Sequence, residues 1–213
     1  MTRKYTLVLA GWLAIILSQA ASADTFDARL LHLQEAWAKA QYDIPAKQRA
    51  DEFEKLHTEA QALIQEHPQR AEPLVWDGII LSTWAGAKGG LGALSLVKDA
   101  RAALEKSIKL DPDALAGSAY TSLGSLYYQV PGWPIAFGDD HKARTLLLKA
   151  LSINPNGIDP NYFYADFLLD QGDKDGARKY LEKAMNAPAR PDRPLADKGR
   201  HQDIRQKLDE LRG

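Results

Sequence analysis

The stretch Tyr120-Thr121-Ser122-Leu123-Gly124-Ser125-Leu126-Tyr127 sets the architecture of the chain, together with Ala143 and Leu147 in the next apolar segment and Pro155 beyond it. Each segment places large apolar residues around one small residue at helical spacing, which predicts two helices that cross closely at Gly124 and Ala143. Proline lacks the amide hydrogen that continues a helix, so Pro155 ends the unit. The stretch therefore predicts a helical hairpin.

Further copies of this hairpin occur on both sides of it. Ala100 and Pro112 have the same separation as Ala143 and Pro155, and Ala177 begins another copy that ends one residue early. We assign these repeat positions: Gly78, Ala100, Pro112, Gly124, Ala143, Pro155, Ala165 and Ala177. Repetition of one hairpin predicts an all-α, right-handed solenoid of about four helix-turn-helix units with a C-terminal capping helix.

The solenoid is expected to form a single domain over residues 24–213. Its repeats are predicted at 26–68, 71–112, 117–155 and 158–188, and its capping helix at 195–211. The first repeat is eroded, so whether it is a true repeat unit stays open.

The first 23 residues have the pattern of a secretory signal peptide. Arg3 and Lys4 precede a short apolar run, and Ala21-Ser22-Ala23 then supplies the small residues that a signal peptidase recognises. We expect cleavage between Ala23 and Asp24 and a periplasmic or secreted protein. An uncleaved membrane anchor is the weaker alternative, because the apolar run is short for a bilayer span.

The composition argues against several classes of function. The chain has no cysteine, which excludes disulfides, thiolate chemistry and lipid attachment at a cysteine. Loss of the signal peptide removes two of the 27 basic residues and none of the 28 acidic ones, which leaves a formal charge of −3. Without a basic run, neither nucleic acid nor an anionic membrane surface is an expected partner, and no membrane span is expected after signal cleavage.

Two long turns between paired helices are the candidate binding elements. One is the glycine-rich segment 84–92, and the other, 130–138, holds Trp133 between Gly132 and Pro134. Stacked repeats place equivalent turns on one edge, so the two turns are expected to form one surface for a partner or a ligand. The alternative is that they only pack over helix ends. The candidate binding residues are Trp84, Lys88, Tyr127, Tyr128, Trp133, Phe137, Tyr162 and Asp166.

The sequence contains no recognisable set of catalytic or metal-binding residues. The glycine-rich segment lacks the Gly-Lys-Ser/Thr ending of a phosphate loop, and the five histidines are scattered. The triplet Asp139-Asp140-His141 is better explained as the start of a helix, capped by an acid. We expect no enzymatic activity, no cofactor and no metal, and a cell-envelope enzyme is the least favoured alternative.

The first helices of the repeats are expected to line a concave groove. Its exposed positions would be Glu72, Val75, Ile79, Ser82, Ser118, Thr121, Ser125, Tyr128, Asp159, Tyr162, Asp166 and Asp170. None of these is lysine or arginine, so the groove is predicted to suit an apolar, neutral or cationic ligand. The alternative is that the C-terminal helix covers this face.

From Ala71 onward the chain resembles the tetratricopeptide-repeat (TPR) superfamily. It is more narrowly similar to the periplasmic TPR proteins associated with TRAP transporters, on the motifs Leu123-Gly124-Ser125-Leu126-Tyr127, Pro131-Gly132-Trp133-Pro134 and Tyr162-x-Tyr164-Ala165. The resemblance implies a protein partner such as a periplasmic substrate-binding protein, and a small apolar ligand. The absence of a lipid-attachment cysteine departs from the family pattern and implies a protein that is free in the periplasm.

Together these features favour a non-catalytic periplasmic scaffold that binds another protein in solute uptake. A carrier of a small apolar ligand is the alternative. The identity of the partner or ligand and the oligomeric state stay open.

Overall fold

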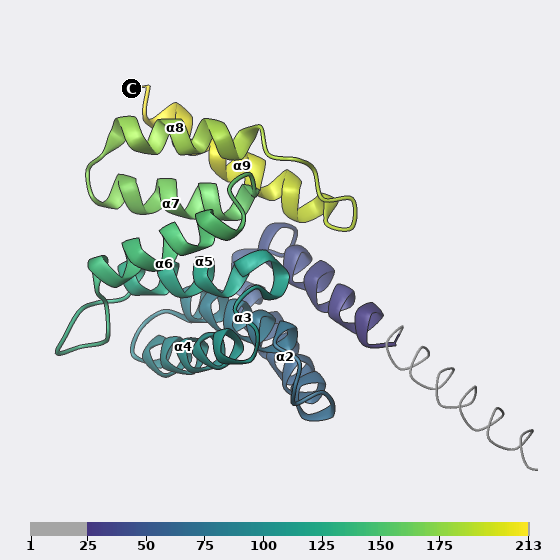
Figure 1. Ribbon diagram of the computed structural model, residues 1–213. Helices are drawn as coiled ribbons and strands as arrows, with labels where there is room; N and C mark the ends of the chain where they lie inside the picture. Colours follow the sequence, from purple (N-terminus) through teal and green to yellow (C-terminus); the bar gives the residue numbers. More distant parts are fainter. Residues whose placement is uncertain (1–24, 213) are drawn as a thin grey trace, which may run out of the picture.

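The computed structural model describes residues 25–212, and within this range the chain folds into helices joined by short connections (Figure 1). A first helix, 25–42, is followed by α2 (Ala46–Glu66), α3 (Glu72–Lys88), α4 (Gly92–Leu110), α5 (Ala114–Gln129), α6 (Asp140–Ile153), α7 (Ile158–Asp170), α8 (Lys174–Met185) and α9 (Pro194–Glu210). The predicted all-α solenoid with a C-terminal helix is confirmed. The signal peptide lies outside the described residues, and in 25–212 we find no helix with the length and hydropathy of a membrane span.

Successive helices pack as hairpins that stack side by side. α3 packs against α4, α5 against α6 and α7 against α8, while α3, α5 and α7 also contact one another in that order. Because a second helix separates each pair of first helices, α3, α5 and α7 run in the same direction and line one inner face (Figure 1). The prolines that end the repeats follow these hairpins directly: Pro112 follows α4 and Pro155 follows α6.

Small residues allow the paired helices to approach closely, as the repeat pattern predicts. A methyl group added at Gly78 would lie 2.5 Å from Leu104 Cγ and 3.2 Å from the Ala100 carbonyl oxygen, and one added at Gly124 would lie 2.8 Å from Leu147 Cγ. Neither position has room for a side chain. The spacing of glycine and alanine along the sequence therefore sets where these helices cross.

The first of the two expected long turns is mostly helical. α3 continues to Lys88 and α4 begins at Gly92, so only residues 89–91 connect them. Gly89 and Gly90 adopt positive φ angles of 62° and 61°, which glycine tolerates without steric cost. The prediction of a loop over 84–92 is wrong, because alanine and lysine in this segment extend the helix up to its glycine cap. The second long turn, 130–139, is a loop as predicted.

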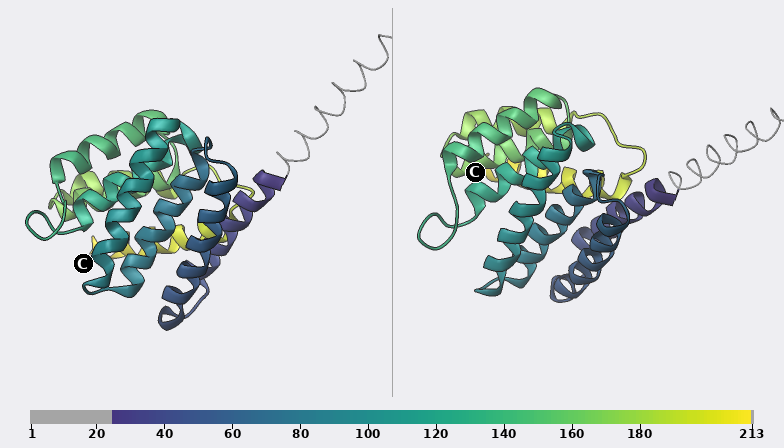
Figure 2. Two further views of the ribbon diagram at one scale, coloured as in Figure 1. Left: turned by 90° about the horizontal axis from the view of Figure 1, so that it is seen from below. Right: turned by 60° about the horizontal axis from the view of Figure 1, so that its bottom comes forward.

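The C-terminal helix closes the solenoid on its inner side and reaches the first helix (Figure 2). Ile204 of α9 is fully buried with Ile158 and Leu181 in a cluster of its own. Nearer the start of α9, Gly199 lies against Tyr42 of the first helix, and a methyl group added at Gly199 would come within 2.4 Å of the tyrosine ring. The Tyr42 hydroxyl also donates a hydrogen bond to Asp203 of α9 at 3.1 Å. Residues about 160 positions apart thereby join the two ends of the domain.

Candidate functional site

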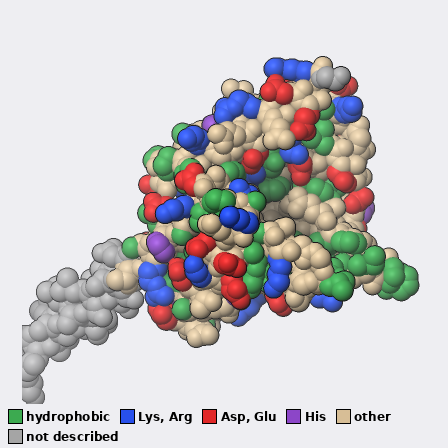
Figure 3. Space-filling view, turned by 180° about the vertical axis from the view of Figure 1, so that it is seen from behind, with side chains coloured by type: hydrophobic (Ala, Val, Ile, Leu, Met, Phe, Trp, Pro, Cys, Tyr) green, Lys and Arg blue, Asp and Glu red, His purple; other side chains and the backbone are tan. Residues whose placement is uncertain are grey.

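A cavity of about 810 Å³ lies on the inner face of the helix pairs. Its walls come from the first helix, from α3, α5 and α7, from the start of α4, and from the connector and helix α9 that cross in front. Figure 3 shows the face opposite to that of Figure 1, which is hollowed near its centre, with hydrophobic side chains inside and charged side chains around them. The alternative that the C-terminal helix covers the groove is therefore borne out in part: α9 forms one wall and leaves a space behind it.

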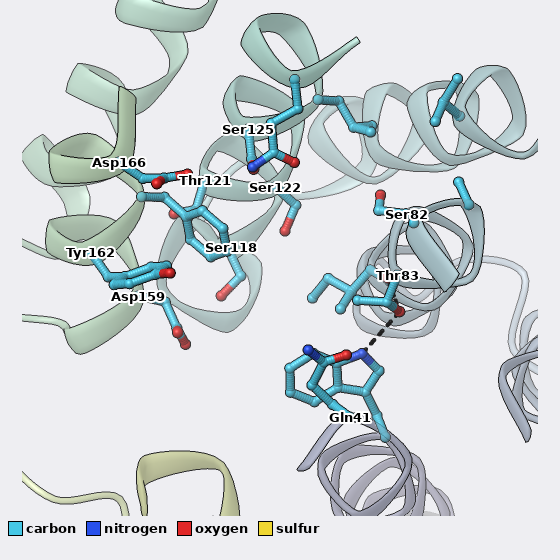
Figure 4. A pocket seen from close by; sticks show the side chains of 18 of the residues that line it. Gln41, Ser82, Thr83, Ser118, Thr121, Ser122, Ser125, Asp159, Tyr162 and Asp166 are labelled. Atoms are coloured by element: carbon cyan, nitrogen blue, oxygen red, sulfur yellow. Dashed lines mark hydrogen bonds between the residues drawn. The ribbon is translucent and has the colours of Figure 1, made fainter. Parts of the chain in front are cut away.

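Hydroxyl groups line the middle of the cavity. Side chains on α3 and α7 point toward the space in front of α5, whose own hydroxyls face it (Figure 4). The residues are Ser82 and Thr83 on α3 and Ser118, Thr121, Ser122 and Ser125 on α5. Helical spacing of three and four residues puts them on one face. Thr83 accepts a hydrogen bond from the Trp37 indole at 3.1 Å, whereas Ser122 has no hydrogen-bond partner among the described residues.

A network of charged side chains holds α9 and the connector against α7. Asp159 accepts hydrogen bonds from Arg190 at 2.6 Å and from Arg200 at 2.9 Å. Burial alone would raise the pKa of Asp159, but the charges of Arg200 and Arg190 outweigh burial and hold it well below its ordinary range. Asp197 and Asp203 complete the network, with contacts of 2.6 Å to Arg190 Nε and 3.1 Å to Arg200 Nη1.

A second ion pair sits further along α7. Asp166 accepts a hydrogen bond from the Tyr128 hydroxyl at 2.6 Å and pairs with Lys207 of α9 at 2.5 Å. Burial first, and the Asp166 carboxylate second, raise the pKa of Tyr128 far above its ordinary value, so this phenol remains a hydrogen-bond donor. Tyr162 lies between the two ion pairs, with the Arg200 guanidinium 4.2 Å from its ring centroid.

Only part of the predicted binding set lies at this cavity. Tyr162 and Asp166 line it, and Tyr128 supports Asp166 from behind. Tyr127 at the end of α5 and Phe137 in the α5–α6 loop pack edge to face, with their ring centroids 5.4 Å apart. This contact holds the end of the loop against α5, and neither ring lines the cavity.

Trp84 and Lys88 face away from the cavity. The Trp84 ring is buried with its centroid 5.9 Å from that of His57 on α2, and the Lys88 amine lies 5.2 Å above it. His57 Nδ1 is 2.7 Å from an oxygen of the buried Asp77, and this hydrogen bond raises the pKa of His57. The expected aromatic surface of Trp84 and Trp133 therefore does not form, because Trp84 lies within a helix.

The α5–α6 loop projects from the edge of the domain. Trp133 is 90% exposed and Ile135 is 63% exposed, although the loop backbone is anchored where Gly138 donates to the Pro131 carbonyl at 2.9 Å. Figure 3 shows the loop as an apolar lobe at the lower right. Val130 and Pro131 at its start line one end of the cavity, as does Gly90 of the other turn. Both turns therefore contribute backbone to the cavity lining, without forming the shared aromatic surface that was expected.

Three arginines at the cavity are absent from the groove predicted from the sequence. Arg190 and Arg193 come from the connector and Arg200 from α9. The prediction of a groove without basic residues is wrong, because it took only the first helices of the repeats as its lining. The only feature of the sequence that could have indicated them is the cluster of arginines in residues 190–200. In the sequence alone, this segment resembles an ordinary polar linker.

The candidate metal triplet is explained by helix capping, as expected. Asp139 is the N-cap of α6, and its side chain accepts a hydrogen bond from the Lys142 amide at 3.0 Å. Within the part of the chain that the structure describes, we find no group of three histidine or acidic side chains placed to hold a metal ion.

Comparison with known proteins identifies the repeat. Residues 158–189 match the family described as tetratricopeptide repeat. The structure is similar to the crystal structure of TTC0263, a thermophilic TPR protein in Thermus thermophilus, with a TM-score of 0.57 and 15% identity over 91% of this chain and 94% of that one. A weaker likeness links it to MamA, with a TM-score of 0.45 and 20% identity over 78% of this chain and 90% of that one. A comparison with curated protein sequences gives no match. The match at residues 158–189 and the likeness to TTC0263 support the TPR superfamily and its fold, and the narrower resemblance to TRAP-associated proteins stays a prediction.

Proposed function

We propose that this protein, which has the TPR fold, is a non-catalytic binding protein that holds one small ligand in its inner cavity. The observation that carries the proposal is the cavity itself. Its volume of about 810 Å³ falls within the range of roughly 300 to 1,000 Å³ that is typical of small-molecule sites. Its lining combines apolar side chains with hydroxyl and charged groups that could fix the orientation of a ligand.

The closure of the groove favours a small ligand over a helical peptide. The first helix and α9 cross the inner face and are joined at Tyr42, Gly199 and Asp203. A partner helix laid along α3, α5 and α7 would have to displace these contacts. A compact molecule can occupy the space behind them without breaking any.

Filling the cavity is expected to abolish ligand binding. Ser122→Trp adds a large ring at the cavity wall, where the serine hydroxyl has no partner among the described residues, so the fold loses no contact. Native mass spectrometry of protein purified gently from a periplasmic extract should show one bound molecule on the unmodified chain and none on this variant. Ser152→Trp, at an exposed site on α6, is the matched control and should retain the molecule. An equal adduct on both variants would place the ligand elsewhere.

A second candidate function is that of a protein-interaction scaffold, which the TPR fold suggests. The observation that favours it is the exposed Trp133 at the tip of the α5–α6 loop, since exposed aromatic residues commonly anchor protein interfaces. The proposal includes a periplasmic location, supported by the amino-terminal pattern, and a component of TRAP-type solute uptake as the partner, supported by the narrower resemblance.

Trp133→Ala is expected to reduce cross-linking to a periplasmic partner at least tenfold, because the tryptophan is the most exposed large apolar side chain of the loop. Quantitative mass spectrometry of cross-linked proteins measures this. Leu148→Ala, at a residue 44% exposed on α6, is the control and should leave the cross-linked species unchanged. Unchanged cross-linking in the Trp133 variant would remove the loop from the interface, and the cavity ligand should be retained in both variants.

A further inference from the structure

Arg193 differs from the other cations around the cavity. Its guanidinium carbon lies 4.9 Å from the centroid of the Trp76 ring, and both side chains line the cavity. The Arg193 side chain makes no hydrogen bond and no salt bridge with any residue in 25–212, and its Nε is buried without an acceptor. The aromatic face therefore supports this guanidinium while its hydrogen-bond donors remain unmatched by the protein.

Each acidic group that lines the cavity already has its own basic partner. Asp159 is shared by Arg190 and Arg200, and Asp203 accepts from Arg200 and Tyr42. Asp197, behind the lining, takes the remaining donors of Arg190, and Asp166 pairs with Lys207. These carboxylates are therefore committed. Arg193 feels the charges of Asp159 and Asp197, but its side chain makes no hydrogen bond to either of them, so among these cations its guanidinium is the one whose hydrogen-bond donors are left for a ligand.

Arg193 keeps this charge despite its surroundings. Burial and the neighbouring Arg190 lower the pKa of Arg193 to about 10, which leaves it protonated at neutral pH. The charges of Asp159 and Asp197 offset part of the cost of burying this guanidinium, but its hydrogen-bond donors still lose water, which is costly unless an acceptor pairs with them. The planar fork of arginine is suited to bidentate pairing with a carboxylate.

The opposite end of the cavity is mostly apolar. α3, α5 and α7 run in the same direction. Trp76, which packs on Arg193, lies near the start of α3, so the arginine is at the end of the cavity where these helices begin. The opposite end of the cavity is where they end. At that other end the lining includes the apolar residues Leu94, Val97, Leu126, Val130 and Pro131, with Gln129 as a polar but uncharged neighbour. The cavity is therefore amphipathic along its length, with the serine and threonine hydroxyls in between.

We propose that the cavity selects an organic anion, a carboxylate whose charged end pairs with Arg193 and whose apolar body extends toward Leu126 and Val130. This inference rests on the proposed function of a ligand-holding cavity and adds the chemical class of the ligand. It replaces the expectation of a neutral or cationic ligand, which followed from a groove without arginine. The apolar part of that expectation is kept.

Three eight-carbon probes with different head groups test the charge preference. Octanoate, octan-1-ol and octylammonium are titrated into the purified protein at pH 7 by isothermal titration calorimetry. Octanoate is expected to bind about ten- to a hundredfold more tightly than octan-1-ol, as for a hydrogen bond to a charged group. Octylammonium is expected to bind no more tightly than the alcohol, because Arg193 repels it.

Arg193→Gln should remove the preference for octanoate without changing the affinity for octan-1-ol. Arg193→Lys, which keeps the charge and loses the fork, should retain part of the preference. Arg205→Gln, at an exposed residue of α9 away from the cavity lining, is the matched control and should behave as the unmodified chain. Circular dichroism and the melting temperature establish that each variant is folded.

The outcomes separate this inference from the proposed function. Equal affinities for octanoate and octan-1-ol, or a preference that survives in Arg193→Gln, would overturn the assignment of an anionic ligand while leaving a ligand-holding cavity in place. If none of the three probes binds, the proposal that the ligand is an amphiphilic carboxylate is overturned as well. The native mass spectrum of Ser122→Trp then decides independently whether the cavity holds any ligand at all.

Discussion

Replacing Asp159 by asparagine is expected to lower the free energy of unfolding by about 3 kcal/mol, the effect of breaking a largely buried ion pair by removing one partner. The Asp159 carboxylate accepts from Arg190 and Arg200 at 2.6 and 2.9 Å. Asparagine keeps the shape and leaves both guanidinium groups without their shared counter-charge. Because these arginines belong to the connector and α9, the C-terminal segment should detach first.

Urea denaturation as a function of pH measures this effect and its sign. The folded pKa of Asp159 is depressed, so its stabilisation is fully present above the unfolded value of about 3.9 and is lost as the pH falls toward the folded value. The difference between the unmodified chain and Asp159→Asn should therefore be largest at neutral pH and shrink below about pH 4.

A matched control lies on α9. Asp209 pairs with Arg212 at 3.2 Å, and both side chains are about 70% exposed. Solvent screens this pair, so Asp209→Asn should change the free energy of unfolding by less than about 0.5 kcal/mol. Equal stability of the two variants at neutral pH would show that the Asp159 network does not hold the C-terminal segment.

Phe167→Ala is expected to have the largest effect on stability, a loss of about 3 to 5 kcal/mol. Phe167 is fully buried in α7, and its ring centroid lies 5.5 Å from that of Tyr128 and 6.3 Å from that of Tyr164. The Arg144 guanidinium adds a cation–π contact at 4.9 Å. Truncation removes the contacts of the ring and leaves a cavity where α5, α6 and α7 meet.

The functional consequence follows from the position of Tyr128. This side chain packs on Phe167 and donates its hydroxyl to Asp166 in the cavity wall. We therefore expect Phe167→Ala to weaken ligand binding as well as folding. Thermal unfolding measures the first loss, with Leu148→Ala on the exposed face of α6 as the control. If the melting temperature of Phe167→Ala falls no further than that of Leu148→Ala, the burial of Phe167 does not contribute the expected stability.

The repeat architecture is predictable because its determinants are local in sequence. The apolar spacing around Gly124 and Ala143 defines two helices, and Pro155 ends the second, with no need for distant information. Eight of the predicted groove positions line the cavity for the same reason: helical periodicity places them on one face of α3, α5 and α7. Asp139 is likewise identifiable as a helix cap from its neighbours alone.

The errors arise where the outcome depends on contacts between distant residues. The glycines that follow Trp84 favour a loop there, whereas helix α3 extends past it and the ring packs on His57 of α2. The arginines of the connector carry no periodic signal. They reach the cavity because Gly199 fits against Tyr42 and directs α9 back across the inner face.

Local sequence is sufficient to define the helices, their order and the close crossings at glycine and alanine, because side-chain spacing and backbone preferences act within one hairpin. Which residues enclose the cavity, and which charge faces a ligand, depends instead on how distant segments pack. The physical reason is the length scale of the interactions. The network of Asp159, Arg190 and Arg200 spans up to 41 residues along the chain and forms only after the solenoid has curved and its C-terminal helix has folded back.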